Sequence, residues 1–389
     1  MSQIEQRMQR EKIVIVGPAY PYRGGQALVE AYLYHSLEQQ GYDVHTVSYS
    51  LLYPSVFFPG TTQFDESSFV PFEHSHKIKR LINSINPYTW FKAAKHIRKN
   101  QPTVVLFVWW MPFFGPALST IAGLIKRKTD AKVVFLVENY VSHEKRWFDR
   151  FMTKITLKHA DAFICQSAYI HEQLTLNFAA KPVYKTTLSI YDCYDLKRYS
   201  QTQARELLNI RAKKVILFFG LIRPYKGLDQ LLRTFQLLLQ EDPDQLLLVV
   251  GECYEDPDKY TALMKELQLE GKVQLHSRFI PNEEIEPYFK AADVVCLPYY
   301  SGTQSGILMM AYGFKIPVVA TNVGGISELI VPEKTGIVVP SNDPSELFMG
   351  LRRIFELQQE VDFAEQITTF TGELGYAGMA TFLKDIRNE

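Results

Sequence analysis

The sequence predicts an α/β protein built from two doubly wound, Rossmann-like domains in tandem. Its 389 residues exceed the roughly 250–300 residues at which a single hydrophobic core stops growing. Short apolar runs alternate with helical patterns, and this alternation begins twice along the chain. Strands that alternate with helices indicate a parallel sheet covered by helices on both faces.

In the first half, runs rich in β-branched and aromatic residues indicate buried strands. These strands are expected at 13–16, 44–47, 104–108, 133–137 and 162–165, with a helix over 27–40. Residues 104–125 carry no charge and are long enough to cross a bilayer. Because Pro112, Gly115 and Pro116 interrupt this segment, we expect a strand, a loop and a helix instead of a membrane span.

The second half repeats the same pattern after residue 190. Strands are expected at 215–219, 246–250, 273–275, 294–297, 318–320 and 336–339, with helices over 229–240 and 260–269. We therefore expect a first domain over 1–190 and a second over 191–355. Residues 356–389 are expected to form a C-terminal helical segment that packs back on the first domain.

The net charge of zero conceals two oppositely charged halves. Residues 1–190 hold 22 basic and 14 acidic residues, whereas residues 191–389 hold 20 and 28. The neutral total argues against a nucleic-acid-binding protein, and the basic first half points to an anionic surface or ligand. The four cysteines form no CxxC pair, so we expect a reduced, cytoplasmic protein with no zinc site.

Ligands of doubly wound sheets bind beyond the carboxyl ends of the strands, so the loops after strands are the candidate sites. The loop after the first strand contains Gly24 and Gly25 directly before a helix. This pattern suits either an anion at the helix N-terminus or an ordinary tight turn. It is not a dinucleotide fingerprint, because the GxGxxG spacing is absent.

The loop over 219–227 follows the first strand of the second half. Arg223 and Lys226 lie three residues apart there, and Gly227 precedes a helix. Arginine can bind phosphate oxygens with its planar fork, and lysine adds a point charge. The alternative is a pair of solvated cations in a surface turn.

Two further loops in the second half combine small polar residues, glycines and a following helix. The loop over 298–306 is followed by Ile307 and forms an anion cradle or a simple helix cap. Within it, Gln304 can hydrogen-bond a sugar hydroxyl. The loop over 321–328 ends at Glu328, which could equally complement a helix dipole. The polar candidates of the first of these loops are Thr303, Gln304, Ser305 and Gly306.

These loops resemble those of retaining glycosyltransferases of family 4, whose GT-B fold has two Rossmann-like domains facing across a cleft. The resemblance covers about residues 200–340. It rests on FFGLIRPYKGLDQLL (218–232), VVGE (249–252), FIPNEEIEPYF (279–289), AADVVCLPYYSGTQSGILMMAYGFKIPVVATNVGGISELI (291–330) and TGIVVP (335–340). In the first half, only the loop at Gly24–Gly25 and NYVSHEKR (139–146) resemble the acceptor side of the family.

The resemblance implies transfer of a sugar from a nucleotide-diphosphate sugar to a saccharide or lipid-linked acceptor, with retention of configuration. No metal and no other cofactor is expected, because Arg223 and Lys226 would neutralise the diphosphate. The resemblance implies that backbone amides of Ser305 to Ile307 bind the phosphates and that the backbone around Phe279 and Ile280 receives the base. It further implies that Gly24 and Gly25 close over the donor, and that His143 lies near the sugar or the acceptor hydroxyl.

The sequence departs from the family pattern at two positions. The family commonly carries two glutamates seven residues apart, and Gly302 and Met310 occupy the corresponding positions here. Gln304 could replace the first glutamate, as in a subgroup with a TQSG loop. Alternatives therefore stay open: another GT-B enzyme, such as a nucleotide-sugar epimerase or hydrolase, or a non-catalytic binder of nucleotide sugars.

The basic first half also contains a candidate membrane-binding segment. Residues 77–80 and 92–99 are rich in Lys and Arg, and Trp90 and Phe91 adjoin them. A basic helix with aromatic side chains can lie on an anionic membrane, although a solvated helix face is the commoner case. His74 and His76 are expected to be solvated. This segment predicts a cytoplasmic protein that is peripheral on the inner face of the membrane.

Overall fold

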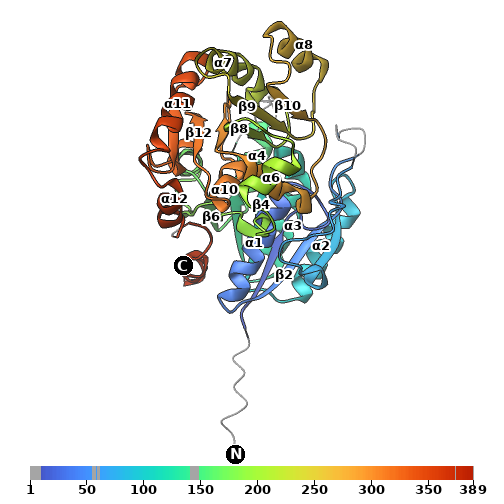
Figure 1. The fold of residues 1–389 in the computed structure, drawn as a ribbon. Helices are drawn as coiled ribbons and strands as arrows, with labels where there is room; N and C mark the ends of the chain where they lie inside the picture. Colours follow the sequence, from blue (N-terminus) through green and yellow to red (C-terminus); the bar gives the residue numbers. More distant parts are fainter. Residues whose placement is uncertain (1–9, 55–57, 59–61, 141–148, 373, 389) are drawn as a thin grey trace, which may run out of the picture. The chain divides into compact units, whose positions relative to one another are not determined.

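The computed structural model describes residues 10–54, 58, 62–140, 149–372 and 374–388 (Figure 1). The chain divides into two compact units. The first comprises Met1–Asp65, Pro71–Ser189 and Gly375–Glu389, and the second comprises Glu66–Val70 and Ile190–Leu374. Each unit is a parallel sheet with helices packed against it, so the predicted α/β fold with two Rossmann-like domains is confirmed.

The sheet of the first unit has seven parallel strands in the order β3-β2-β1-β4-β5-β6-β7. All five predicted strands are present, whereas β3 and β7 were not predicted from the sequence. Every residue of the central strand β4 is buried, as its apolar sequence requires. The strands are β1 Lys12–Val16, β2 Asp43–Leu51, β3 Ile78–Asn83, β4 Val104–Trp109, β5 Lys132–Val137, β6 Ala162–Cys165 and β7 Val183–Lys185.

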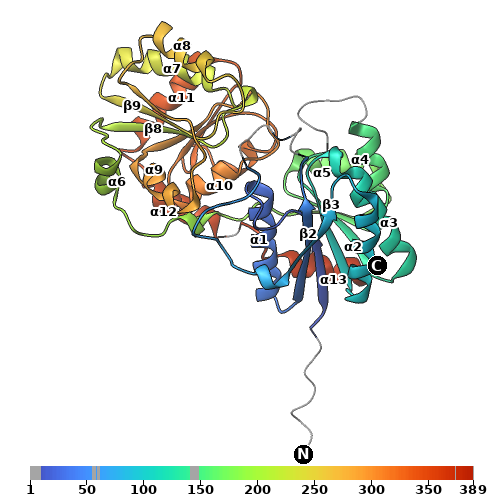
Figure 2. The same ribbon diagram turned by 90° about the vertical axis from the view of Figure 1, so that its right-hand side faces the viewer.

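Six helices accompany this sheet in the part of the first unit that the structure describes. They are α1 Gly25–Gln39, α2 Pro87–Lys99, α3 Gly115–Lys128, α4 Asp149–Leu157, α5 Ala168–Asn177 and α13 Met379–Asn388. α2 packs beside α3, and α3 packs beside α4, in one layer (Figure 2). The apolar segment 104–125 forms β4, a short 3-10 turn and most of α3, as predicted. Among the described residues, no helix is long and apolar enough to span a bilayer.

The sheet of the second unit has six parallel strands in the order β10-β9-β8-β11-β12-β13, and all six were predicted. Its strands are β8 Lys214–Phe219, β9 Gln245–Val250, β10 Val273–His276, β11 Val294–Leu297, β12 Val318–Thr321 and β13 Gly336–Val339. Its helices are α6 Gln201–Leu207, α7 Leu228–Glu241, α8 Asp258–Glu266, α9 Ile285–Ala291, α10 Gly306–Gly313, α11 Pro344–Leu357 and α12 Phe363–Thr371.

The C-terminal residues return to the first unit. Gln40 is hydrogen-bonded to this segment twice, since its Nε2 donates to the Tyr376 carbonyl at 3.1 Å and its Oε1 accepts from the Ala380 amide at 2.8 Å. The Tyr376 hydroxyl also accepts a hydrogen bond from Gln166 Nε2 at 2.7 Å. α13 therefore belongs to the first unit, whereas α12 belongs to the second.

The prediction of a solvated His74 is wrong. The His74 ring is 4% exposed, and its Nε2 lies 3.1 Å from Oε2 of Glu30, which is fully buried on α1. Its Nδ1 lies 2.7 Å from the Phe72 carbonyl, and Tyr34 stacks on the ring. Burial opposes protonation, but the hydrogen bond and charge of Glu30 outweigh it and raise the pKa of His74. His76 is exposed, as predicted.

Candidate functional site

The order of strands in the second unit reverses between β8 and β11, which are hydrogen-bonded neighbours. In doubly wound sheets, the crevice at the carboxyl ends of two such strands is the usual ligand site. The loops that leave β8 and β11 are 220–227 and 298–305. Both were singled out in the sequence, and the topology brings them side by side.

Glycine conformation sets the path of the first of these loops. Gly227 has a φ of 67°, and a Cβ on it would stand 1.9 Å from the Pro298 carbonyl oxygen. No side chain fits there, so the glycine permits the β8 loop to touch the β11 loop. The Tyr300 amide also donates to the Tyr225 carbonyl at 2.7 Å, which joins the two loops by a hydrogen bond.

Lys226 is a buried cation at this junction. Its side chain is 8% exposed, and its Nζ lies 5.4 Å from the ring centroid of Tyr299. Within the part of the chain that the structure describes, no carboxylate forms an ion pair with it. Burial, with a further contribution from Arg223, lowers the pKa of Lys226 to about 8. A buried ammonium without a counter-ion is suited to an anionic ligand.

Arg223 is the second cation of the β8 loop. Its guanidinium carbon lies 4.9 Å from the ring centroid of Tyr254, and it is partly exposed. Its Nε is buried and has no hydrogen-bond partner among the described residues. An unsatisfied donor beside a buried cation is consistent with a ligand that bears several acceptor oxygens.

The N-terminus of α10 approaches the same point. A Cβ on Gly220 would lie 3.1 Å from Nζ of Lys226 and 3.2 Å from Cδ1 of Ile307, so the lysine and the first turn of α10 meet there. The Ser305 hydroxyl caps the helix by accepting from the Leu308 amide at 3.4 Å. The amides of Gly306 and Ile307 stand in the first turn, where helices have no acceptor of their own and the dipole is positive.

Gln304 is the other polar candidate in the β11 loop. Its Nε2 is buried without a hydrogen-bond partner among the described residues. The Thr303 carbonyl accepts from the Gly325 amide at 2.9 Å, which attaches the β12 loop to the β11 loop. Glu328 is exposed and lies in the 3-10 turn Ser327–Leu329, which follows that loop.

The structure offers no carboxylate at the two positions where the resemblance places family glutamates. Gly302 lies under the β12 loop, since a Cβ on Gly324 would stand 1.8 Å from the Gly302 carbonyl oxygen. The Met310 side chain is 6% exposed within α10. The main chain is crowded at Gly302, and the apolar side chain of Met310 is buried. Neither position therefore supplies a carboxylate.

A short segment from the first half of the sequence, residues 66–70, lies next to the residues expected to hold the base. Phe279 and Ile280 follow β10, and Ile280 is 6% exposed. In the next turn, the Asn282 amide donates to the Ser67 hydroxyl at 2.9 Å, and Asn282 Nδ2 donates to the Phe69 carbonyl at 3.0 Å. Residues 66–70 therefore belong to the second unit, which no pattern in the sequence predicted.

The first unit has its own candidate groups at the carboxyl ends of its strands. Gly24 has a φ of 105° and precedes α1, and a Cβ on Gly24 or Gly25 would meet no atom within 4 Å. His143 lies outside the described residues. Glu138 directly follows β5 and was missed in the sequence, although its place after a buried strand could have identified it.

Glu138 is a buried carboxyl with an unsatisfied oxygen. Its Oε2 accepts a hydrogen bond from Gln26 Nε2 at 3.1 Å, whereas its buried Oε1 has no partner among the described residues. Burial raises its pKa to about 7, although the hydrogen bond from Gln26 opposes the shift. A carboxyl that titrates near neutral pH can donate or accept a proton at a hydroxyl group.

The family models match the two halves of the chain separately. Residues 200–369 match the family described as glycosyl transferases group 1, and residues 23–184 match Glycosyltransferase Family 4. Each half of the chain thus matches a family of glycosyltransferases, and the two matches together span most of the sequence. Among the described residues, no group of three His, Cys, Asp or Glu side chains is arranged to hold a metal ion.

Individual proteins with similar sequences are also named as glycosyltransferases. D-inositol 3-phosphate glycosyltransferase of Corynebacterium aurimucosum is 30% identical over 179 residues, which are 44% of this chain and 42% of that protein. The chain spans between 34% and 61% of the length of the curated relatives compared with it.

Two solved structures share the fold over nearly the whole chain. Sucrose-phosphate synthase of Thermosynechococcus elongatus has a TM-score of 0.72 at 19% identity and covers 97% of this chain and 98% of its own. Anabaena HepE, solved with UDP and glucose, has a TM-score of 0.66 at 15% identity, with the same coverage of both chains.

Proposed function

We propose that the protein is a glycosyltransferase that moves a sugar from a nucleotide-diphosphate sugar to a saccharide or lipid-linked acceptor. The matches of both halves to glycosyltransferase families and the GT-B fold support this proposal. The observation that carries it is the buried Lys226 ammonium, which lies beside the first turn of α10 and shares its loop with Arg223. Two cations and free helix amides at a switch point are the groups that a diphosphate requires.

The same groups would stabilise the transition state. As the sugar–phosphate bond lengthens, negative charge grows on the leaving diphosphate, and fixed cations and amides lower the energy of that state. Lys226, Arg223 and the amides of Gly306 and Ile307 would supply this stabilisation without a divalent ion. We infer retention of configuration, in which the acceptor hydroxyl attacks the face that the diphosphate leaves and the leaving phosphate accepts the hydroxyl proton.

The remaining loop residues would select the donor. Backbone groups at Phe279 and Ile280 would receive the base, and the unsatisfied Gln304 amide would hydrogen-bond a sugar hydroxyl. Thr303 and Glu328 would bind on the same side of the crevice. HepE binds UDP and UDP-glucose, so uridine nucleotides are the first donors to test.

A stability screen with nucleotide diphosphates and their sugars tests the donor class. A ligand at about 100 times its Kd stabilises the folded state by about 2.7 kcal/mol, which raises Tm by about 5 °C or more in a unit of this size. We expect one nucleotide to produce such a rise. If none of UDP, GDP, ADP, CDP and their glucose derivatives changes Tm, the proposed donor site is refuted.

Two other activities are separated by their products. A nucleotide-sugar epimerase or hydrolase would convert the donor when no acceptor is present, whereas a transferase would convert it only slowly. Gly302 and Met310 specifically favour a third possibility, a protein that binds the donor without turnover, because both family carboxylates are absent. Donor binding without product, against a panel of lipid-linked and free saccharides, would identify that case.

We also propose a cytoplasmic protein that works at the inner face of the membrane. None of its four cysteines forms a disulfide, which suits a reducing compartment. The basic first half supplies the charge for an anionic surface, and a lipid-linked acceptor would be presented there.

A further inference from the structure

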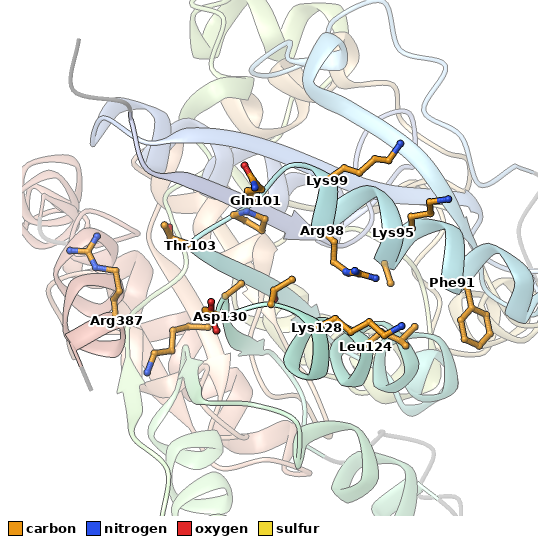
Figure 3. A pocket seen from close by; sticks show the side chains of 15 residues that line it. Phe91, Lys95, Arg98, Lys99, Gln101, Thr103, Leu124, Lys128, Asp130 and Arg387 are labelled. Carbon is orange, nitrogen blue, oxygen red and sulfur yellow. The ribbon is translucent and has the colours of Figure 1, made fainter. Parts of the chain in front are cut away.

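A groove with a volume of about 860 Å³ opens between α2 and α3 of the first unit (Figure 3). Thr103, which precedes β4, and Lys132, which begins β5, line its floor. The groove therefore lies at the amino ends of these strands. Glu138 and Gly24 lie at the carboxyl ends, so the groove is separate from the candidate site for sugar transfer.

The groove is strongly basic. Six cationic side chains line it and only one carboxylate, that of Asp130, accompanies them. The cations are Lys95, Arg98, Lys99, Lys128, Lys132 and Arg387. Arg387 pairs with Glu11, whereas the other five form no ion pair in the part of the chain that the structure describes.

Helix dipoles account for only part of this charge. Cations in the last turn of a helix are favoured, which explains Arg98 and Lys99 on α2 and Lys128 on α3. Lys95 lies a turn earlier, and Lys132 lies on a strand. Both nevertheless line the same groove as the cations at the helix ends, and this clustering needs a further cause.

Large apolar side chains continue the basic face toward the start of α2. Phe91 lines the groove and is 55% exposed, and Tyr88, one turn earlier, is 76% exposed. Tyr88, Phe91 and Lys95 follow the spacing that places side chains on one face of a helix. Ile85, just before the helix, is 56% exposed. Trp90, which the sequence suggested as part of this face, is buried, and its indole donates to the Asn83 carbonyl at 2.7 Å.

We propose that this face, formed by the groove between α2 and α3 together with Ile85, Tyr88 and Phe91, docks the protein on an anionic lipid bilayer. The combination identifies the partner. A soluble polyanion would be held by the cations alone, whereas a bilayer also accepts apolar side chains below its headgroups. The inference names the place at which the membrane partner of the proposed function binds, and it uses none of the residues assigned to the donor.

Vesicle sedimentation tests this face directly. The full chain is expected to bind phosphatidylglycerol-containing vesicles and not pure phosphatidylcholine vesicles, and high salt should weaken the binding. Lys95→Glu combined with Lys99→Glu should weaken binding by about 30-fold or more, because each lost cation near an anionic surface costs about fivefold and the new carboxylates are repelled. Lys265→Glu combined with Lys334→Glu, which changes the same charge on exposed lysines of the second unit, should bind as the unmodified protein does.

A second pair of variants tests the apolar part. Tyr88→Ala with Phe91→Ala should remove the binding that survives at high salt, whereas Leu176→Ala with Leu207→Ala, at comparably exposed leucines, should not. Equal binding to neutral and anionic vesicles, or unchanged binding of the Lys95 and Lys99 variant, would overturn the proposal. So would capture of soluble polyphosphate with no binding to anionic vesicles.

Donor binding measured on the same variants separates this proposal from the proposed function. The Lys95 and Lys99 variant should keep the full rise in Tm with the donor nucleotide, which also shows that it is folded. Loss of vesicle binding with normal donor binding supports the docking face. Vesicle binding by a protein that responds to no nucleotide would refute the donor site and leave the docking face standing.

Discussion

The ammonium nitrogen of Lys226 lies 5.4 Å from the ring centroid of Tyr299, so the loop after β8 and the loop after β11 meet through a buried cation and an aromatic ring. Tyr299 is itself 3% exposed, and its hydroxyl lies 3.4 Å from the hydroxyl of Ser305, which caps α10. The cation, the ring and the helix cap thus form one continuous contact. An anion that enters this contact would neutralise a charge that burial otherwise penalises.

Donor binding should weaken as the pH rises above about 8. Burial lowers the pKa of Lys226 to about 8, so the free protein loses the charge there, while a bound diphosphate favours the protonated form. The Kd of UDP, measured by calorimetry between pH 7 and pH 9, should rise toward about tenfold per pH unit at the upper end. Lys226→Arg should flatten this dependence, because arginine stays charged. A flat profile for the unmodified protein would contradict the assignment.

Glu138→Gln should stabilise the protein at pH 8 and leave it nearly unchanged at pH 5. The folded-state pKa of Glu138, about 7, is above its ordinary value of 4.5. The stability that protonated Glu138 contributes is therefore lost as the pH rises through 7, on the order of 3 kcal/mol in full. Urea unfolding at both pH values measures the difference. Equal stability of the two proteins at pH 8 would show that Glu138 is solvated in the folded state.

His74→Ala should destabilise the first unit by about 3 kcal/mol at pH 6, because it leaves the fully buried carboxylate of Glu30 without its cation. The pKa of His74 is raised, so the stability from this pair is present below pH 6.5 and is lost as the pH rises through the folded-state pKa. Urea unfolding of His74→Ala and Glu30→Gln, alone and together, gives the coupling. His76→Ala, at an exposed neighbour, is the control and should have no effect.

Gly227→Ala should damage the donor site and the fold around it. The new Cβ would stand 1.9 Å from the Pro298 carbonyl oxygen, and the φ of 67° disfavours a side chain. A loss of about 2 kcal/mol or more in unfolding free energy is expected. Gly25→Ala is the matched control for stability, since its Cβ would meet no atom within 4 Å. If both variants have the unfolding free energy of the unmodified protein, the loops after β8 and β11 do not approach each other as closely as described.

Most of the fold was predictable because its strands are buried on both faces. Runs such as 104–108 and 246–250 are apolar at every position, so they can be recognised as strands even though polar and apolar residues do not alternate in them. β3 was missed because Lys79 and Arg80 are exposed on an edge strand, which hides the apolar pattern. β7 was missed because it has only three residues.

The loops proposed to bind phosphate could be found in the sequence because their residues are contiguous and directly follow strands. The groups that were missed depend on contacts between distant parts of the chain. Burial raises the pKa of Glu138, and its one hydrogen-bond partner, Gln26, lies 112 positions away. His74 is buried in contact with Glu30, which lies 44 positions earlier in the chain. The packing of residues 66–70 beside Asn282 was missed for the same reason, since it joins segments more than 200 positions apart in the sequence.

The central claim is that Lys226 is the main cation for the donor diphosphate. Isothermal titration of UDP, or of whichever nucleotide raises Tm most, into Lys226→Ala tests it, with Lys265→Ala as the control at an exposed lysine. Loss of a charge-assisted contact to phosphate should weaken binding by about tenfold to 100-fold or more, while the control binds normally. Unchanged affinity of folded Lys226→Ala for the nucleotide would contradict the account.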